Sequence, residues 1–190
     1  MPILGTPACI GYNGTKVMAM DPGSNTVGLA IINVYPNDPR YYLEDTVFLH
    51  AKRFMPKDSD ILRRYGERAA RIEWLKHQFG QCLNIYQPDC FIAEAPYMGK
   101  QASAFEALVE ARTHFKIVLG QYDPLMFYHY IDPKSVKVFM GAVDNSKPAM
   151  RAAVLSNQNI VWPSHIDREN LTEHEYDAIA VGCFYVNKYV

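Results

Sequence analysis

Residues 16–34 read KVMAMDPGSNTVGLAIINV, and this stretch decides the fold class. Residues 16–21 and 26–34 are rich in β-forming side chains, and the turn-forming sequence DPGSN separates them. A third β-forming run, residues 41–51, follows the sequence YPNDPR, which is also rich in turn residues. The three runs predict an antiparallel meander of three strands.

After the meander, helix and strand patterns alternate. Apolar residues recur at helical spacing through residues 61–83, after a cap at Asp58 or Ser59, so we expect a long amphipathic helix that ends before Pro88. The elements expected next are a buried strand at 90–95, a helix at 103–121, a strand at 126–131, short helices at 133–140 and 148–158, and a last helix from 172 towards 189. This order predicts an α/β protein of the RNase H-like fold, with a mixed five-stranded sheet flanked by helices on both faces.

The composition fits one globular domain. The chain has 190 residues, of which 49% are hydrophobic, and this is enough for a full core. We expect an irregular leader at residues 1–15, where proline and glycine are frequent, and a single domain at 16–190. The four cysteines lack disulfide or zinc spacing and are interpreted as reduced thiols. Because the chain has no signal peptide and no apolar run of about 18 residues, it is predicted to be soluble and cytoplasmic, without membrane contact.

The charge pattern leaves two interpretations open. The net charge is −1, which disfavours nucleic-acid binding unless the basic residues cluster. Four arginines fall on one side of the first long helix: Arg63, Arg64, Arg68 and Arg71. They predict either a positive groove or an ordinary solvated helix face with Glu67 and Glu73 as partners.

Two acidic residues stand where strands end. Asp21 comes directly before the Pro22-Gly23-Ser24 turn, so its carboxylate is expected to point out of the sheet. Asp-Pro-Gly is also an ordinary β-turn sequence. Glu94 interrupts the apolar strand FIAEA at 91–95, where a carboxylate is costly unless a cation neutralises it. A buried partner such as Arg112 would explain Glu94 without a function.

The last helix adds two polar residues on one face. His174 and Asp177 are three residues apart and can converge on one ligand, although a surface helix with ordinary charges is the alternative. Thr172 and Glu175 form a capping box, which explains Glu175 structurally. The residues that follow, AIAVG at 178–182, are small and apolar, so this turn is expected to pack on the sheet with Asp177 facing inward.

These positions predict a metal site. In the expected fold the ends of the first and fourth strands are neighbours and the last helix lies across them, so three carboxylates and an imidazole share one cavity. The predicted ligands are Asp21, Glu94, His174 and Asp177. Hard oxygen ligands suit Mg²⁺ or Mn²⁺ better than zinc, and a pair of such ions is usual for phosphodiester displacement. We therefore predict metal-assisted hydrolysis with two ions in the site.

The same residues resemble the RuvC family of Holliday junction resolvases. The resemblance rests on MDPGS at 20–24, IAE at 92–94 and HEYDAIA at 174–180, and it extends from about residue 16 to the C-terminus. The family pattern is Asp, Glu and a D/H-x-x-D-A-x-A helix, within which His is a known variant. The resemblance implies a homodimer that nicks four-way DNA junctions symmetrically and leaves 5'-phosphate and 3'-hydroxyl ends. The leader and the loop at 35–42 depart from the family.

The resemblance also implies roles for other side chains. Lys137 and Lys147 are expected near the scissile phosphate, although each alone would be interpreted as a solvated lysine. The segment 98–120 is similar to the family helix that forms the dimer contact. Tyr97 takes the place of an aromatic that stacks on junction bases, and core packing explains it equally well. The residues expected to contact DNA are Tyr97, Lys100, Lys134 and Arg151.

Other functions remain open. A cutter of RNA:DNA hybrids, or a general branch and flap nuclease, would use the same metal chemistry. A non-catalytic DNA-binding scaffold of this fold would not need three inward acids. Actin-like and sugar-kinase ATPases share the Asp-x-Gly turn, but the chain has no second such hairpin and no Walker-type glycine run, so no nucleotide cofactor is expected.

Overall fold

The computed structural model describes residues 14–96, 101–144 and 146–189. One sheet forms its centre, with the strand order β5-β4-β1-β2-β3-β6. The strands are β1 (Thr15–Asp21), β2 (Thr26–Val34), β3 (Tyr41–His50), β4 (Cys90–Glu94), β5 (Phe127–Ile131) and β6 (Ile160–Val161). The predicted meander is present, because β2 pairs antiparallel with both β1 and β3. β4 runs parallel to β1 and to β5, so the sheet is mixed, as expected.

The predicted strand count was wrong by one. β6 has two residues and pairs parallel with the start of β3, through Tyr41 and Tyr42. A two-residue strand is too short to produce an alternating pattern in the sequence, which is why it was missed. The sheet therefore has six strands in the described part of the chain.

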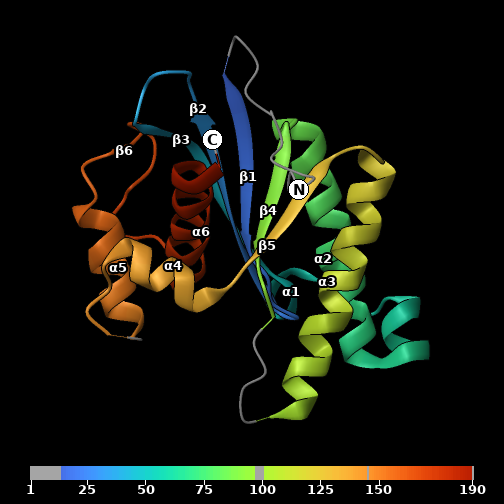
Figure 1. The fold of residues 1–190 in the computed structure, drawn as a ribbon. Helices are drawn as coiled ribbons and strands as arrows, with labels where there is room; N and C mark the ends of the chain where they lie inside the picture. The colour runs from blue at the N-terminus through green and yellow to red at the C-terminus, as the bar shows by residue number, and fades with distance from the viewer. Residues whose placement is uncertain (1–13, 97–100, 145, 190) are drawn as a thin grey trace, which may run out of the picture.

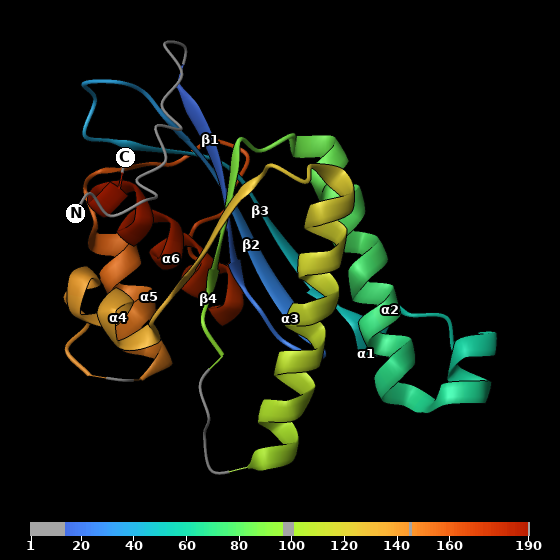
Figure 2. The same ribbon diagram turned by 45° about the vertical axis from the view of Figure 1, so that its right-hand side comes forward.

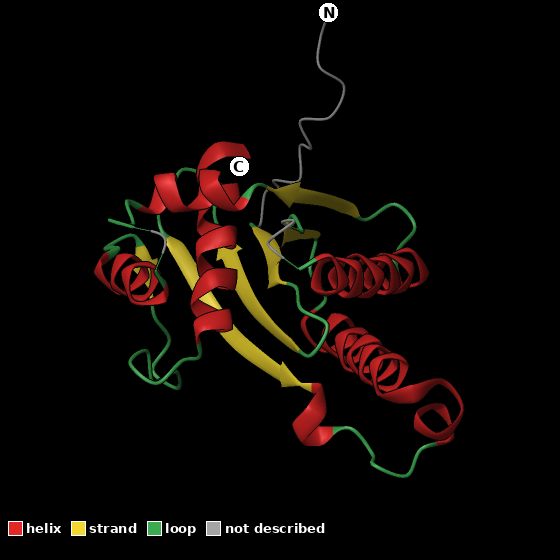
Figure 3. Ribbon diagram, turned by 90° about the horizontal axis from the view of Figure 1, so that it is seen from below, coloured by secondary structure: helices red, strands yellow, loops and turns green. Residues whose placement is uncertain are grey.

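Helices cover both faces of the sheet, as predicted (Figures 1 and 2). One face packs on α2 and α3 through a core that includes Met18, Leu29 and Phe91. The other face packs on α4, α5 and α6 through a second core that includes Val17 and Ile92. Figure 3 shows α6 lying along the strands, opposite the α2 and α3 pair. The helices are α1 (Ala51–Phe54), α2 (Asp60–Tyr86), α3 (Ala102–Tyr122), α4 (Pro133–Met140), α5 (Lys147–Ser156) and α6 (Glu173–Tyr189).

Several boundaries differ from the prediction by a residue or more. Ala51 starts the short helix α1 instead of ending β3. Ser59 caps α2 by accepting a hydrogen bond from the Leu62 amide, so the second of the two predicted caps is confirmed. The long helix is interrupted at Gly66, whose φ of 83° and ψ of 177° are not helical. Arg63 and Arg64 precede this break, and the arginines after it therefore do not continue their helix face.

Strand alternation assigns each side chain to a face. On β1, Val17 and Ala19 belong to the core beneath α6, while Met18 and Met20 belong to the core beneath α2 and α3. Asp21 follows in step with Ala19, so its side chain lies on the α6 face. Glu94 follows in step with Ile92, which also belongs to the α6 core. The two carboxylates therefore emerge on the same face of the sheet.

Three remaining expectations concern the chain as a whole. Cys82 and Cys183 are buried reduced thiols, as predicted, Cys90 is also buried, and Cys9 lies outside the described residues. Within the described ranges, no helix combines the length and the apolar character needed to span a membrane. The expected leader ends earlier than predicted, because Thr15 already belongs to β1, and residues 1–13 lie outside the description.

Candidate active site

Asp21 and Glu94 lie at the carboxyl ends of two neighbouring parallel strands. The β1–β4 register pairs Ala19 with Ile92 and Met20 with Ala93, and its continuation brings Asp21 beside Glu94. Only 14% of the Asp21 side chain is exposed. The neighbouring strand ends thus bring together two carboxylates that are 73 residues apart in the sequence.

The first turn of α6 lies directly on β2 because residue 28 is glycine. A Cβ at Gly28 would lie 2.0 Å from the carbonyl oxygen of His174 and 2.9 Å from the amide nitrogen of Glu175. Gly28 also pairs with Asp21 in the β1–β2 ladder. The missing side chain therefore allows His174 to approach Asp21. Sequence analysis overlooked this role, although glycine inside a strand pattern is a sign of close backbone approach.

A capping box fixes the start of α6, as predicted. Both the amide and the hydroxyl of Thr172 donate to Glu175 Oε2, at 2.8 and 2.7 Å. The amide of Glu175 donates back to Thr172 Oγ1 over 3.4 Å. Glu175 also accepts a hydrogen bond from the Thr46 hydroxyl on β3 at 2.8 Å. Glu175 is therefore a buried structural carboxylate that holds α6 on the sheet.

His174 is bound at both ring nitrogens. Its Nδ1 lies 2.7 Å from Asp21 Oδ2, and its Nε2 lies 2.9 Å from the hydroxyl oxygen of Thr26. The ring of Phe48 stacks on the imidazole with 5.8 Å between centroids and 10° between planes. Neither Thr26 nor Phe48 had a signal in the sequence, because their proximity to His174 depends on strand register.

Asp177 faces a small cavity at the same strand ends. The cavity has a volume of about 90 Å³ and is lined by Asp21, Glu94, Pro133, Val136, Lys137, Ser146, Lys147, Met150 and Asp177. Lys147 Nζ lies 2.6 Å from Asp177 Oδ2. Lys147 is the first residue of α5, where the Ser146 side chain caps the helix. Five of the six residues predicted to be catalytic thus line one cavity, and the sixth, His174, contacts it through Asp21.

The electrostatics of the cavity are those of crowded carboxylates. Burial and the charges of Asp21 and Asp177 raise the pKa of Glu94 to about 8, against the opposing effect of Lys147 and Lys137. Burial also raises the pKa of Asp21, although its hydrogen bond with His174 acts in the opposite direction. Burial acts against the Lys147 ammonium, yet the hydrogen bond and charge of Asp177 raise its pKa overall. The carboxylates thus disfavour one another's ionised forms, and a cation bound beside them would relieve this repulsion.

The predicted partner of Glu94 is elsewhere. The guanidinium of Arg112, on α3, lies 4.9 Å from the ring centroid of Tyr130, which packs against the core beneath α2 and α3. The cationic charges that act on Glu94 are those of Lys147 and Lys137. A simple buried ion pair with Arg112 therefore does not account for this carboxylate.

The donor set suits a hard divalent cation. Three carboxylates that converge with two lysines match the oxygen ligands that Mg²⁺ and Mn²⁺ prefer. Among the described residues, no three His, Cys, Asp or Glu side chains are arranged so that they could hold an ion together. The contacts explain this, because Lys147 binds Asp177 and His174 binds Asp21. An ion would compete with these two side chains for the carboxylates.

Two predicted DNA-binding residues lie at some distance from the cavity. Lys134 lines a separate groove of about 440 Å³ between α4 and α6, together with Lys188. Arg151 binds the Glu169 carboxylate at 2.7 Å and the Tyr176 hydroxyl at 3.2 Å. The other two, Tyr97 and Lys100, lie outside the described residues.

The arginines of α2 are largely neutralised by acids. Arg63 binds Asp60, Arg71 binds Glu67, and Arg68 binds both Glu106 and Glu110. Glu67 is thus a partner as the solvated-face interpretation expected, while Glu73 binds Lys76 instead. These pairs favour an ordinary ionic helix face over a positive groove.

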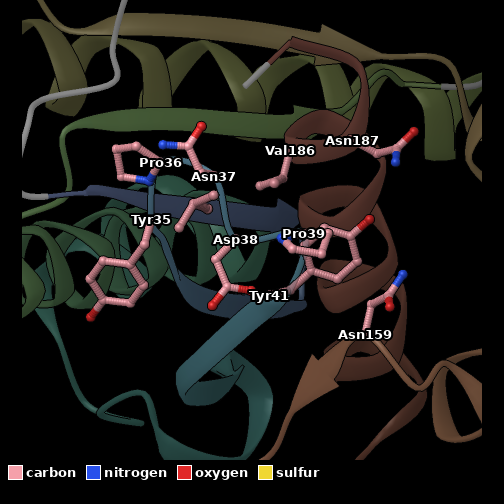
Figure 4. Close-up of a pocket in the computed structure, with 10 residues that line it drawn as sticks. Tyr35, Pro36, Asn37, Asp38, Pro39, Tyr41, Asn159, Val186 and Asn187 are labelled. Carbon is pink, nitrogen blue, oxygen red and sulfur yellow. The ribbon is translucent and has the colours of Figure 1, made fainter.

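A larger cavity lies elsewhere in the described part of the chain. It has a volume of about 520 Å³ and lies where the β2–β3 loop meets the end of α6 (Figure 4). Asparagine and tyrosine side chains dominate its lining, and its one charged group, Asp38, is bound by Arg40 and Tyr42. The cavity where three carboxylates and two lysines converge is therefore the better candidate for chemistry.

The chain is similar in sequence to known RuvC nucleases. No family model matches the chain. The chain is 29% identical over 144 residues to a crossover junction endodeoxyribonuclease RuvC from Xanthomonas oryzae pv. oryzae, which covers 75% of this chain and 76% of the relative. A RuvC from Xanthomonas campestris pv. campestris is 30% identical over 98 residues, 52% of this chain and 49% of the relative.

Solved structures show the same fold. The RuvC of T. thermophilus in complex with Holliday junction substrate superposes with a TM-score of 0.63 and 15% identity, covering 90% of this chain and 92% of the other. The yeast mitochondrial Holliday junction resolvase superposes with a TM-score of 0.65 and 12% identity, covering 92% and 78%. The resemblance to RuvC in sequence and the RNase H-like fold are both confirmed.

Proposed function

We propose that this RuvC-like chain is a structure-selective endodeoxyribonuclease that resolves four-way DNA junctions by metal-dependent hydrolysis of phosphodiester bonds. The observation that carries the proposal is the convergence of Asp21, Glu94 and Asp177, from two strand ends and one helix, on a cavity that two lysines also line. Relatives that match three quarters of the chain are crossover junction endodeoxyribonucleases, which supports this substrate class. The products are nicks with 5'-phosphate and 3'-hydroxyl ends.

The acidic residues would hold two Mg²⁺ or Mn²⁺ ions. Asp21, Glu94, Asp177 and His174 would be their ligands, because Asp21 contacts His174 directly and lines one cavity with Glu94 and Asp177. Bound ions supply positive charge on both sides of an in-line displacement at phosphorus. The chain itself orients the carboxylates and excludes bulk water, because the strand ends and α6 are packed around them. No protein nucleophile is required.

The two lysines bind the phosphate. Lys137 and Lys147 line the cavity, and an ammonium beside the reacting phosphate stabilises the negative charge of the transition state. Lys147 is held by Asp177 at 2.6 Å. Lys147 would thus be positioned between Asp177 and the phosphate and could pair with either anion.

DNA binding and assembly follow from the symmetry of the substrate. A four-way junction offers two equivalent strands, and a homodimer would place one site on each. Lys134 and Arg151 lie on the helices that border the cavity and would contact backbone phosphates. Lys100 would also contact DNA, and Tyr97 would stack on junction bases. We place the protein inside the cell, where its DNA substrate is found.

The test is a cleavage assay with matched acidic variants. Labelled four-way junction, three-way junction, linear duplex and RNA:DNA hybrid are incubated with the protein in Mg²⁺ or Mn²⁺. Asp21→Asn and Asp177→Asn remove one charge each within the site. Asp123→Asn is the matched control, because Asp123 follows α3 and precedes the amino end of β5, away from the catalytic ends of the strands.

The expected result is paired, ligatable nicks in the four-way junction that disappear in Asp21→Asn and Asp177→Asn and persist in Asp123→Asn. Cleavage of the hybrid alone, or of all branched substrates equally, would support metal-dependent hydrolysis but would contradict the four-way junction as the specific substrate. Binding of junctions without cleavage of any substrate by the wild-type protein would identify a DNA-binding scaffold.

A further inference from the structure

The imidazole of His174 is held on three sides by residues from three strands. Asp21 of β1 contacts Nδ1 at 2.7 Å, Thr26 of β2 contacts Nε2 at 2.9 Å, and Phe48 of β3 stacks on the ring. Glu173 Oε1 is 3.8 Å from Nε2, which is beyond hydrogen-bond distance. Thr26 is therefore the hydrogen-bond partner of this nitrogen.

Strand register explains why these residues meet. Gly28 pairs with Asp21 on one side and with Phe48 on the other, so the three residues form one row across the sheet. Thr26 is two residues from Gly28 and faces the same side of β2. The backbone of α6 lies against Gly28, and the His174 ring fills the space between the three neighbouring side chains.

The chemistry of the threonine hydroxyl matters, because it can either donate or accept. While Nδ1–H donates a hydrogen bond to the Asp21 carboxylate, the threonine hydroxyl can donate a hydrogen bond to the unprotonated Nε2. Once a cation binds Nδ1, that nitrogen has no proton, and the hydroxyl can accept from Nε2–H. A histidine that binds a metal generally donates its other ring N–H to such a partner, which fixes its tautomer and its orientation.

We propose that Thr26 is a positioning residue, whose hydroxyl bonds His174 Nε2 and keeps Nδ1 directed at the cation that Asp21 holds. The proposal rests on the metal-dependent function proposed above. The geometry supports it, because two adjacent ligands of one octahedral ion lie about 3 Å apart when each is about 2.1 Å from the metal. The 2.7 Å between Nδ1 and Asp21 Oδ2 is close to that separation.

The experiment compares three threonine substitutions. Thr26→Val removes the hydroxyl and keeps the side-chain shape, whereas Thr26→Ser restores the hydroxyl. Thr46→Val is the matched control, because Thr46 also donates a buried hydroxyl hydrogen bond to the first turn of α6, but to Glu175. Mn²⁺ affinity is measured by calorimetry on the protein without DNA. The ¹⁵N shifts of the His174 ring are measured in the Mg²⁺-saturated protein, and thermal unfolding reports on folding.

The expected result is a loss of Mn²⁺ affinity of about 10- to 100-fold in Thr26→Val, with recovery to within about 3-fold of wild type in Thr26→Ser. The His174 ring in wild type and Thr26→Ser carries its proton on Nε2, and Thr26→Val shows a mixture of tautomers. Thr46→Val lowers Tm and keeps the wild-type Mn²⁺ affinity.

Three outcomes overturn the proposal. Wild-type affinity in Thr26→Val, or a loss in Thr26→Ser as large as in Thr26→Val, would show that the hydroxyl does not position His174. An equal loss in Thr46→Val would assign the effect to the docking of α6. In each case Mn²⁺ binding by the wild type would leave the proposed function standing, whereas a wild-type protein that binds no Mn²⁺ would overturn both.

Discussion

Replacing Gly28 with alanine is expected to push the first turn of α6 away from the sheet. The added Cβ would lie 2.0 Å from the carbonyl oxygen of His174 and 2.3 Å from its carbonyl carbon. Both atoms belong to the backbone, so no side-chain rotation relieves the clash. Because non-bonded carbon atoms prefer separations of about 3.5–4.0 Å, the turn must move by roughly 1 Å or more.

The displacement has two measurable consequences. Overpacking of this kind destabilises a protein by about 1–3 kcal/mol. Each kcal/mol lowers Tm by about 2–4 °C in a chain of this size, so we expect a fall of roughly 2–12 °C. Because the same movement carries His174 away from Asp21, cleavage is expected to slow by about 100-fold, as for other misplacements of about 1 Å.

The assay is single-turnover cleavage of a four-way junction at saturating protein, well below the Tm of every variant. Gly182→Ala is the control, because Gly182 also lies between α6 and the sheet, where an added Cβ would be 2.5 Å from Ile32 Cδ1. That atom is the mobile end of a side chain, so Gly182→Ala should lower Tm and preserve the rate. Wild-type cleavage by Gly28→Ala would refute the reasoning, as would an equal loss of rate in Gly182→Ala.

Three further predictions concern charge and backbone. Burial and the neighbouring acids raise the pKa of Glu94 to about 8, from an ordinary value of about 4.3. Between these two pH values the folded protein keeps the Glu94 proton and the unfolded chain does not, so the free energy of unfolding falls as pH rises. Glu94→Gln should therefore raise the metal-free Tm at pH 8 and leave it unchanged at pH 4, and a lower Tm at pH 8 would contradict this. Gln87→Gly should stabilise the protein by about 0.5–1 kcal/mol in urea unfolding, because Gln87 ends α2 with a φ of 48°, and a loss of stability would show that its side chain matters more than its backbone. Lys137→Ala should slow single-turnover cleavage, because Lys137 lines the cavity. Lys134, which lines a separate groove, should matter for binding instead, so Lys134→Ala should weaken junction affinity and reduce its salt dependence. Equal effects of the two substitutions on the cleavage rate would contradict this difference.

The acidic site could be predicted from the sequence because its members break strong local patterns. Glu94 is a charge in an apolar strand, and Asp21 ends a strand at a turn. Asp177 precedes a run of small apolar residues on a buried helix. Each pattern assigns a side chain to a face, and one topology then brings the three together.

The surroundings of His174 could not be predicted in the same way. Thr26 and Phe48 are ordinary β-forming residues, and only the pairing of β2 with β3 brings them to the same ring. Gly28 acts through the approach of a helix that begins 145 residues later in the chain. Such contacts depend on distances between elements, which residue spacing does not contain.

Spacing was also insufficient for the basic residues. Arg151 lies one helical turn after Lys147 on α5, yet its guanidinium reaches Glu169 rather than the cavity. Lys134 lies one turn before Lys137 on α4, but it lines the groove towards Lys188. A long basic side chain can reach several acids or grooves, and which of them it contacts depends on where the neighbouring helices lie.

The pairing of Asp21 with His174 joins residues 153 positions apart in the chain. During synthesis, β1 leaves the ribosome long before α6. An unfinished chain therefore contains Asp21 and Glu94 but lacks His174 and Asp177, which α6 carries. The sheet face that α6 covers, including Val17, Ala19 and Ala30, stays without its cover until then. Loop closure over this separation makes the docking of α6 a late event in folding. A nascent chain therefore lacks part of the candidate site, and under the proposed function it would gain the ability to cut DNA only after α6 has docked.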